Sequence, residues 1–159
     1  MPNWAGVLQE IQTSEGGLDR IRRKYLQKLH KKTGRNIIAY YSGWLQKPNL
    51  AGCSISDLDK NGLMNAVHGL NRAKGLDLFL HTPGGDFAAT ESMVHYLRQI
   101  FGTNIRCFIP QLAMSGGTMM ACACKEIFMG KESNIGPIDP QFSGIPAHGV
   151  IAEFQEALE

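Results

Sequence analysis

One arrangement constrains the fold of this chain most: a strand, a glycine-rich turn and a helix occur twice in succession. The first unit is predicted over Leu76–Phe101, with the turn Thr82-Pro83-Gly84-Gly85, and the second over Ile105–Lys125, with the turn at residues 111–118. Alternating strands and helices imply parallel strands joined by right-handed crossovers. The turns that follow parallel strands open on the same edge of the sheet, where α/β proteins place their sites. We therefore predict an α/β fold in which two glycine-rich turns face one another.

Other segments follow the same patterns. β-branched and aromatic residues predict strands at Asn36–Tyr41 and Glu126–Met129. Apolar residues at helical spacing predict further helices at Asn3–Gln12, Leu18–Lys32, Asp57–Leu70 and Val150–Leu158. In the third of these helices we expect Leu58, Met64, Val67 and His68 to face partly inward. These elements suggest an N-terminal helical segment over residues 1–35 and an α/β domain over residues 36–159. Because the apolar periodicity continues to the last positions, we expect this domain to be C-terminally incomplete.

Composition limits the classes of protein that fit. A chain of 159 residues is about one domain's worth, and 43% hydrophobic with 19% charged residues is typical of a soluble globular protein. The four cysteines form no CxxC pair, so we expect reduced thiols. No apolar run is long enough to span a bilayer, and the first residues lack a signal-peptide pattern. These features predict a cytoplasmic location.

The predicted helix at residues 18–32 is strongly basic. Eight of the 16 basic residues of the chain lie between Arg20 and Arg35. A solvated helix face explains this run, and so does docking to an anionic membrane surface or an acidic partner. The net charge of +2 and the lack of interleaved aromatic residues argue against nucleic acid. We see no metal-ligand cluster and no phosphate-loop spacing, so we expect no cofactor.

Ser115 is the most informative single residue. It falls between the predicted strand Ile105–Ile109 and an apolar helix, and two glycines follow it. A nucleophile at the start of a helix lies near unpaired amides that can stabilise an oxyanion. The amide of Gly116 and, from the neighbouring turn, that of Gly85 can serve as two such donors. The alternative is an ordinary cap, because serine is a favoured N-cap and glycine pairs are common in turns.

Three motifs resemble known serine proteases. LFLHTPGG at residues 78–85, AMSGGTM at 113–119 and IGPIDPQF at 135–142 stand in the order found in serine dehydrogenase proteinases. These enzymes are similar to Clp-type proteases and signal peptide peptidase A enzymes. The resemblance covers residues 36–159 and implies a Clp/crotonase spiral of ββα units, preceded here by amphipathic helices. It implies serine-type peptide hydrolysis by a self-compartmentalising or membrane-associated homo-oligomer. Ser115 would be the nucleophile, and Gly85 and Gly116 would form the oxyanion hole.

The general base departs from the pattern that the resemblance implies. Clp proteases place a histidine after the serine, where this chain has Asp139. An aspartate has an ordinary pKa near 3.9 and is a weak base unless desolvation raises that pKa. Asp139 is thus a candidate base or orienting group, with a structural role in its turn as the alternative. His148, in the segment PAHG, is a second candidate imidazole. The lysines that signal peptide peptidase A enzymes use have no clear counterpart, and the base can also lie beyond Glu159.

The sequence therefore predicts a serine peptidase that acts on peptides or proteins through an acyl-enzyme on Ser115. Two alternatives stay open. A crotonase-type enzyme would use the same two amides on a thioester enolate without a nucleophile. A non-catalytic assembly or adaptor subunit would keep the fold without the base, and the missing histidine favours it.

Overall fold

A parallel sheet of four strands forms the centre of the protein. The computed structural model describes residues 3–14, 17–47, 49–142 and 145–158. The strands lie in the order β1 (Asn36–Tyr41), β2 (Leu76–His81), β3 (Ile105–Ile109) and β5 (Glu126–Met129). The register aligns Ile38 with Leu78 and Leu78 with Cys107. All four strands have the bounds predicted from the sequence.

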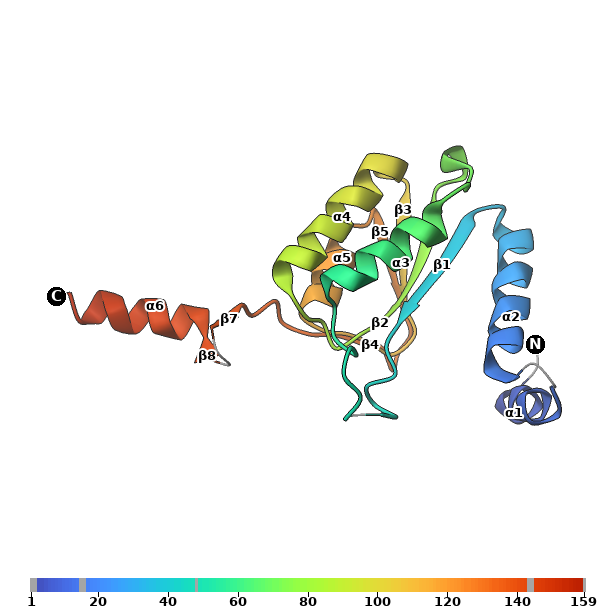
Figure 1. Cartoon of the computed structure of the whole chain (residues 1–159), viewed down its shortest axis with the longest axis horizontal. Helices are drawn as coiled ribbons and strands as arrows, with labels where there is room; N and C mark the ends of the chain where they lie inside the picture. The colour runs from blue at the N-terminus through green and yellow to red at the C-terminus, as the bar shows by residue number, and fades with distance from the viewer. Residues whose placement is uncertain (1–2, 15–16, 48, 143–144, 159) are drawn as a thin grey trace.

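Three helices cover one face of this sheet: α3 (Asp57–Val67), α4 (Phe87–Phe101) and α5 (Gly116–Cys122) (Figure 1). Alternate residues of β2, namely Leu76, Leu78 and Leu80, point into this layer and are fully buried. Helix α4 buries Met93 and Leu97 against them. Each such side chain contributes about 2 kcal/mol by leaving water. The core therefore holds β2, β3 and the turns that follow them at fixed positions.

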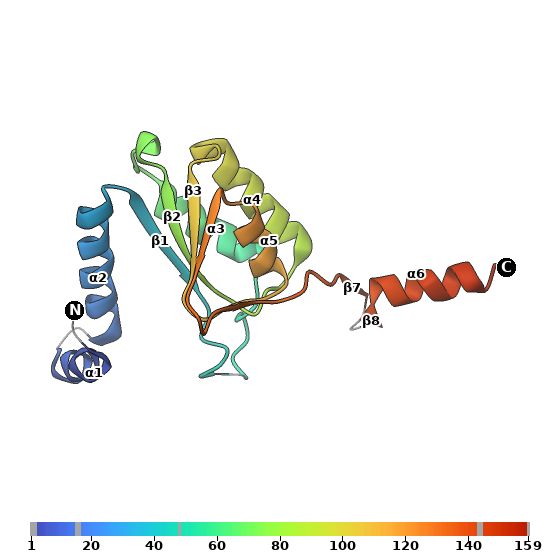
Figure 2. The ribbon, with the colours of Figure 1, turned by 180° about the vertical axis from the view of Figure 1, so that it is seen from behind.

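The opposite face of the sheet is seen in the view from behind (Figure 2), and aromatic side chains lie along it. The rings of Phe79, Phe108 and Phe128, from β2, β3 and β5, stack across the strands with centroids 4.9 Å and 4.7 Å apart. The stack continues outward to the edge strand β5, where 43% of Phe128 is exposed. Such stacked aromatic pairs stabilise neighbouring strands beyond the area they bury.

A buried ion-pair cluster ties the start of the sheet together. The carboxylate of Asp77 is fully buried and accepts bonds from Arg106, through Nε and Nη2 at 2.8 Å and 2.7 Å, and from Arg35 Nε at 2.6 Å. Burial raises the pKa of Asp77, but the bonds from Arg106 and Arg35 outweigh it and hold the pKa below its ordinary value. Arg35 belongs by sequence to the basic run of residues 20–35, but its side chain is bound to Asp77 within the fold.

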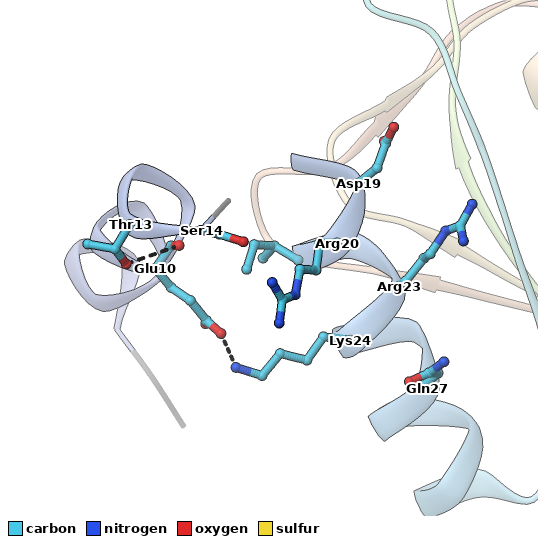
Figure 3. Close-up of a pocket in the computed structure, with 9 residues that line it drawn as sticks. Glu10, Thr13, Ser14, Asp19, Arg20, Arg23, Lys24 and Gln27 are labelled. Carbon is cyan, nitrogen blue, oxygen red and sulfur yellow. Dashed lines mark hydrogen bonds and ion pairs between the residues drawn. The ribbon is translucent and has the colours of Figure 1, made fainter. Parts of the chain in front are cut away.

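Of the N-terminal helices, α2 (Gly17–Thr33) lies beside β1, and α1 (Trp4–Thr13) lies against the first part of α2 (Figure 1). Lys24 pairs with Glu10, which joins the two helices, and Arg22 lies over the ring of Tyr41 at 4.4 Å. A hollow of about 950 Å³ between these helices is lined by both acidic and basic side chains (Figure 3). None of the helices in the described ranges is long and apolar enough to cross a lipid bilayer.

The remaining elements are short. They are the 3-10 helix η1 (Arg72–Lys74), the strands β4 (Leu112–Ala113), β6 (Asn134–Ile135), β7 (Gln141–Phe142) and β8 (Ile145–Pro146), and the helix α6 (Ala147–Glu156). β4 pairs with β6 in parallel, and β7 pairs with β8 in an antiparallel hairpin. Helix α6 extends away from the sheet (Figure 1). Its sequence periodicity therefore does not correspond to packing on the core.

The structure corrects several details of the sequence-based prediction. Helix α3 ends at Val67 instead of Leu70, because Gly69 adopts a φ of 75°. Of the residues expected to face partly inward, Val67 does, but 79% of Leu58 and 43% of Met64 are exposed, and His68 is exposed as well. Leu63 is buried instead. Helix α5 ends at Cys122 and not at Lys125, and α6 begins at Ala147 and not at Val150. These ends depend on turn geometry and packing more than on apolar spacing.

Candidate active site

The two glycine-rich turns meet through main-chain hydrogen bonds. Thr82, directly after β2, donates its amide to the carbonyl of Leu112 at 3.1 Å, and its own carbonyl accepts from the amide of Met114 at 3.0 Å. Thr82 thereby forms a parallel bridge with Ala113. Because parallel strands end at the same edge, the turns after β2 and β3 lie side by side. The predicted juxtaposition of the turns is confirmed.

Ser115 occupies a strained position between β4 and α5. Its φ is 50° and its ψ is −114°, and it is the only non-glycine residue with positive φ in the described ranges. Such a conformation costs about 1–3 kcal/mol and persists only where the surroundings impose it. The side chain is half-buried and, although Ser115 stands at the N-cap of α5, it makes no capping hydrogen bond. The interpretation of Ser115 as an ordinary cap therefore lacks its expected bond.

Gly84 lies against Ser115. A Cβ on Gly84 would come within 2.7 Å of the Ser115 Cβ and 2.6 Å of the carbonyl oxygen of Met114. No side chain fits between the two turns at this point. The amide of Gly84 is already used, because it donates to Thr82 Oγ1 at 3.1 Å.

The amides of Gly85 and Gly116 are not used in this way. Gly85 forms a parallel bridge with Ile55, whose amide donates to Gly84 O at 2.8 Å and whose carbonyl accepts from Asp86 N at 2.9 Å. This pairing leaves the Gly85 amide without an acceptor among the described residues. The Gly116 amide, at the first residue of α5, has no acceptor there either. Two main-chain donors thus remain next to Ser115, on the turns that the sequence indicated.

A cleft of about 600 Å³ opens at this point. It holds the predicted residues Ser115, Gly85 and Asp139 together, and its full lining is Ser54, Pro83, Gly84, Gly85, Asp86, Phe87, Met114, Ser115, Pro137, Asp139 and Gln141. A volume of this size is typical of small-molecule and peptide sites. The cleft therefore gathers a serine hydroxyl, a glycine turn and a carboxylate in one place. Gly116, the next residue after Ser115, is buried and is not among the residues that line the cleft.

The segment that carries Asp139 is fastened to the serine turn. The buried hydroxyl of Thr118, on α5, lies 2.8 Å from both the Ala113 and the Gly136 carbonyl oxygens. The amide of Gly136 also donates to the Ala113 carbonyl at 3.2 Å. A Cβ on Gly136 would clash with Met114 Cε, so the segment passes close to the turn that carries Ser115. Asp139 is half-buried and makes no hydrogen bond to any residue in the described ranges.

The other candidate bases lie elsewhere. His148 is exposed on α6 and is not part of the cleft lining. Lys125 and Lys131 are exposed and also outside it. His81 stacks on Trp44 at 4.5 Å, its Nδ1 is buried without a partner among the described residues, and burial lowers its pKa. No histidine or lysine is present in the described lining of the cleft.

Sequence reasoning missed several residues of this site. Ile55 returns from the loop that begins at Ser42 and pairs with Gly85, but nothing in the loop composition indicates that pairing. Thr118 was not singled out, since a buried threonine in a helix has no distinctive pattern. Asp86 could have been found, because an aspartate before an apolar run is typical of an N-cap, and its side chain accepts from Ala89 N at 2.7 Å.

The fold is shared with a Clp protease. The chain is similar to the crystal structure of the ClpP protease catalytic domain from Plasmodium falciparum, with a TM-score of 0.50 over 73% of this chain and 63% of that one. The identity is 11%, so this likeness concerns the fold alone. The predicted α/β fold with a parallel sheet like that of Clp proteases is confirmed.

The sequence match identifies the family. Residues 8–157 match the family described as ClpP-like SDH-type serine proteinase, and the chain belongs to it. Two proteins of Methanocaldococcus jannaschii, both named as uncharacterized, are 32% and 33% identical over 98 and 96 residues. These matches cover 62% and 60% of this chain but 34% and 32% of the relatives. The chain thus matches about a third of the length of these relatives.

Proposed function

We propose that this protein is a serine peptidase that cleaves peptide bonds through an acyl-enzyme on Ser115. The observation that carries the proposal is the strained conformation of Ser115, whose hydroxyl caps nothing and lines the same cleft as Gly85. Strain of this kind at a serine between a strand and a helix is typical of a nucleophile turn. Membership of a serine proteinase family supports the same chemistry.

The proposed reaction follows from the placement of these groups. Ser115 Oγ attacks the carbonyl carbon of the substrate and gives its proton to a general base. The carbonyl oxygen becomes an oxyanion that accepts hydrogen bonds from the amides of Gly85 and Gly116. Each such donor is worth about 3 kcal/mol in acyl transfer. The tetrahedral species then breaks its C–N bond, and the leaving amine takes the proton from the base. Water, deprotonated by the same base, hydrolyses the resulting ester.

For the base we propose Asp139 as the first candidate, acting directly or by orienting another group. It shares the cleft with Ser115, and Thr118 holds its segment in place. An aspartate serves as a base only where its surroundings favour the protonated form more than water does. Closure of the cleft by a bound peptide would supply that desolvation. His148 has less support, because it is exposed on α6 and is not part of the cleft lining.

The proposal is tested by hydrolysis of a fluorogenic peptide amide by the full chain and by Ser115→Ala. The account expects turnover in the native chain and a loss of at least about 1,000-fold in Ser115→Ala, the range seen when a triad member is removed. Ser92→Ala is the matched control, because Ser92 lies on α4 outside the cleft, bonded to Lys60. Equal turnover by the native chain and Ser115→Ala would refute the assignment.

A non-catalytic adaptor or assembly subunit is the second candidate. It is favoured by one observation: neither imidazole nor amine lines the described cleft. In that case the native chain would fold and assemble, but it would not react with a serine-directed fluorophosphonate. Reaction at Ser115 excludes this candidate, and peptide turnover lost in Ser115→Ala establishes the first.

We also propose that the active form is a homo-oligomer that takes peptide or protein substrates, and that residues 1–35 form a separate helical segment. Exposed apolar side chains along β5 (Ile127, Phe128 and Met129) support the proposal of assembly. Peripheral contact of α2 with an anionic membrane is supported by exposed Arg20, Arg23, Lys28, Lys31 and Lys32. Flotation with anionic vesicles tests this contact, since it should weaken as salt rises and on loss of residues 1–35.

A further inference from the structure

The charged side chains that line the cleft around Ser115 are all acidic. Two carboxylates, Asp86 and Asp139, line it, and none of its described lining residues is basic. The chain as a whole carries a net charge of +2, so this acidity is a local feature and not a reflection of composition. The two carboxylates come from different segments: Asp86 follows the turn after β2, and Asp139 lies in the segment after β6. A substrate in the cleft therefore meets negative charge from two parts of the chain.

The carboxylate of Asp86 is held in place by a helix-capping bond. Its Oδ1 accepts from Ala89 N at 2.7 Å, which makes it the N-cap of α4. The positive end of the helix dipole stabilises an anion at this position. The capping bond uses one carboxylate oxygen, and the other has no partner in the described ranges. Asp86 follows Gly85 directly in the chain, and both residues line the cleft.

The rest of the lining suits a long cationic side chain. Pro83, Phe87, Met114 and Pro137 give the cleft apolar walls. Lysine and arginine pack their methylene stems on such surfaces while their charged ends reach polar groups. A glutamate or aspartate side chain would instead bring a third negative charge between Asp86 and Asp139. The cleft thus distinguishes basic from acidic substrates by attraction and by repulsion.

We propose that this cleft selects peptides that carry lysine or arginine close to the scissile bond. The inference deepens the proposed function and rests on it for the bond that is cleaved. The carboxylates face water, so each attraction is modest and is screened over about 8 Å at physiological salt. Together they should favour a lysine peptide over its glutamate counterpart by about fivefold or more at low ionic strength.

The test uses three series of peptidyl aminocoumarin amides, in which the scissile bond is fixed. Each series places lysine, glutamine or glutamate at one of the three positions before the coumarin. We expect kcat/KM in the order lysine, glutamine, glutamate in at least one series, and a smaller spread in 0.5 M salt. Equal rates, or faster cleavage of the glutamate peptides, would overturn the inference while leaving the peptidase assignment intact.

Two variants locate the effect. Asp86→Asn removes the charge but keeps an oxygen for the capping bond, because asparagine is as good an N-cap as aspartate. It should reduce the lysine-to-glutamate ratio by about threefold. Glu91→Gln removes a charge from the same helix outside the cleft and should leave the ratio unchanged. A ratio that is unchanged in Asp86→Asn, or lowered equally by both variants, contradicts the role of Asp86.

Binding separates this inference from the proposed function. Labelled lysine and glutamate peptides are titrated onto Ser115→Ala, and fluorescence anisotropy reports their affinity without any turnover. Tighter binding of the lysine peptide supports the charge preference even if the native chain hydrolyses nothing, a result that would end only the peptidase assignment. Equal binding of the two peptides, or binding of neither, overturns the charge preference.

Discussion

Gly84 and Ser115 are in direct contact: a Cβ on Gly84 would lie 2.7 Å from the Ser115 Cβ. This approach brings the turn after β2 against the turn that carries the proposed nucleophile. It also explains why the turn has two glycines with separate tasks. Gly84 provides space beside Ser115, and Gly85 provides an amide that the fold itself does not use.

Gly84→Ala should therefore damage both stability and reactivity. The added methyl group would meet backbone atoms, and φ at this position is 92°, so we expect a loss of about 3 kcal/mol in the free energy of unfolding. Gly102→Ala is the control, because Gly102 also has positive φ, at 60°, but nothing lies within 4 Å of its Cβ position. It should cost about 1 kcal/mol. Urea unfolding measures both values, and similar losses in the two variants would show that the contact with Ser115 is unimportant.

The strain at Ser115 predicts an unusual gain in stability. Glycine adopts a φ of 50° without the clash that a Cβ causes, so Ser115→Gly should be more stable than Ser115→Ala by about 1 kcal/mol. Both variants lack the hydroxyl, so the comparison isolates the backbone term. Thermal unfolding of the two proteins gives the difference. A Ser115→Gly protein that is less stable than Ser115→Ala would mean that this backbone conformation is not strained.

The hydroxyl of Thr118 should hold the turn that carries Ser115 and the segment that carries Asp139 together through its hydrogen bonds. Thr118→Val keeps the shape but leaves the Ala113 and Gly136 carbonyls without this donor, at a cost of about 1–3 kcal/mol. Thr118→Ser retains the hydroxyl and is the matched control. Hydrogen exchange should rise at residues 134–141 in the valine variant alone. An equal rise in both variants would assign the effect to packing of the threonine methyl group.

Asp77 predicts a pH dependence of stability. Burial raises its pKa, but the bonds from Arg106 and Arg35 lower it further than that, so the folded pKa lies below the unfolded value near 3.9. The stability that this group supplies is thus complete above the unfolded pKa and is lost as pH falls through the folded pKa. Asp77→Asn leaves two arginines without their carboxylate and should cost about 3 kcal/mol at pH 7, and less at pH 3.

The control for Asp77 is Asp19→Asn. Asp19 pairs with Arg22 at 2.5 Å, but its side chain is 81% exposed, so its loss should cost under about 1 kcal/mol. Urea unfolding at pH 7 and pH 3 compares the two variants. A cost for Asp77→Asn as small as that for Asp19→Asn, or one that grows toward pH 3, would contradict the role given to the buried cluster.

The sequence was sufficient for the parts of the fold that local pattern governs. The strands β2 and β3 and the helix α4 have the predicted bounds, because apolar periodicity and the Pro-Gly turns mark both ends. The alternation of strands and helices also predicted that the turns of Gly85 and Ser115 lie at one edge of the sheet. The pairing of Ile55 with Gly85 could not be predicted, since it joins a loop without periodicity to a turn 30 residues away.

The candidate site was predictable to a similar extent. The position of Ser115 follows from the strand-to-helix junction, but its positive φ follows only from the neighbours that enforce it. The motif IGPIDPQF was enough to single out Asp139. Its place in the cleft depends on the contact between Thr118 and Gly136, which no sequence pattern predicts. The acidic character of the cleft could be recognised only from the structure, because Asp86 and Asp139 are far apart in the sequence.

The central claim is that Ser115 Oγ and the amides of Gly85 and Gly116 surround one reacting oxygen. A crystal structure of the full chain after treatment with a serine-directed fluorophosphonate tests it most directly. The account predicts a phosphonyl group on Ser115 whose oxygen lies about 2.7–3.1 Å from both amide nitrogens. An unmodified Ser115, or a phosphonyl oxygen that points away from both amides, would contradict it.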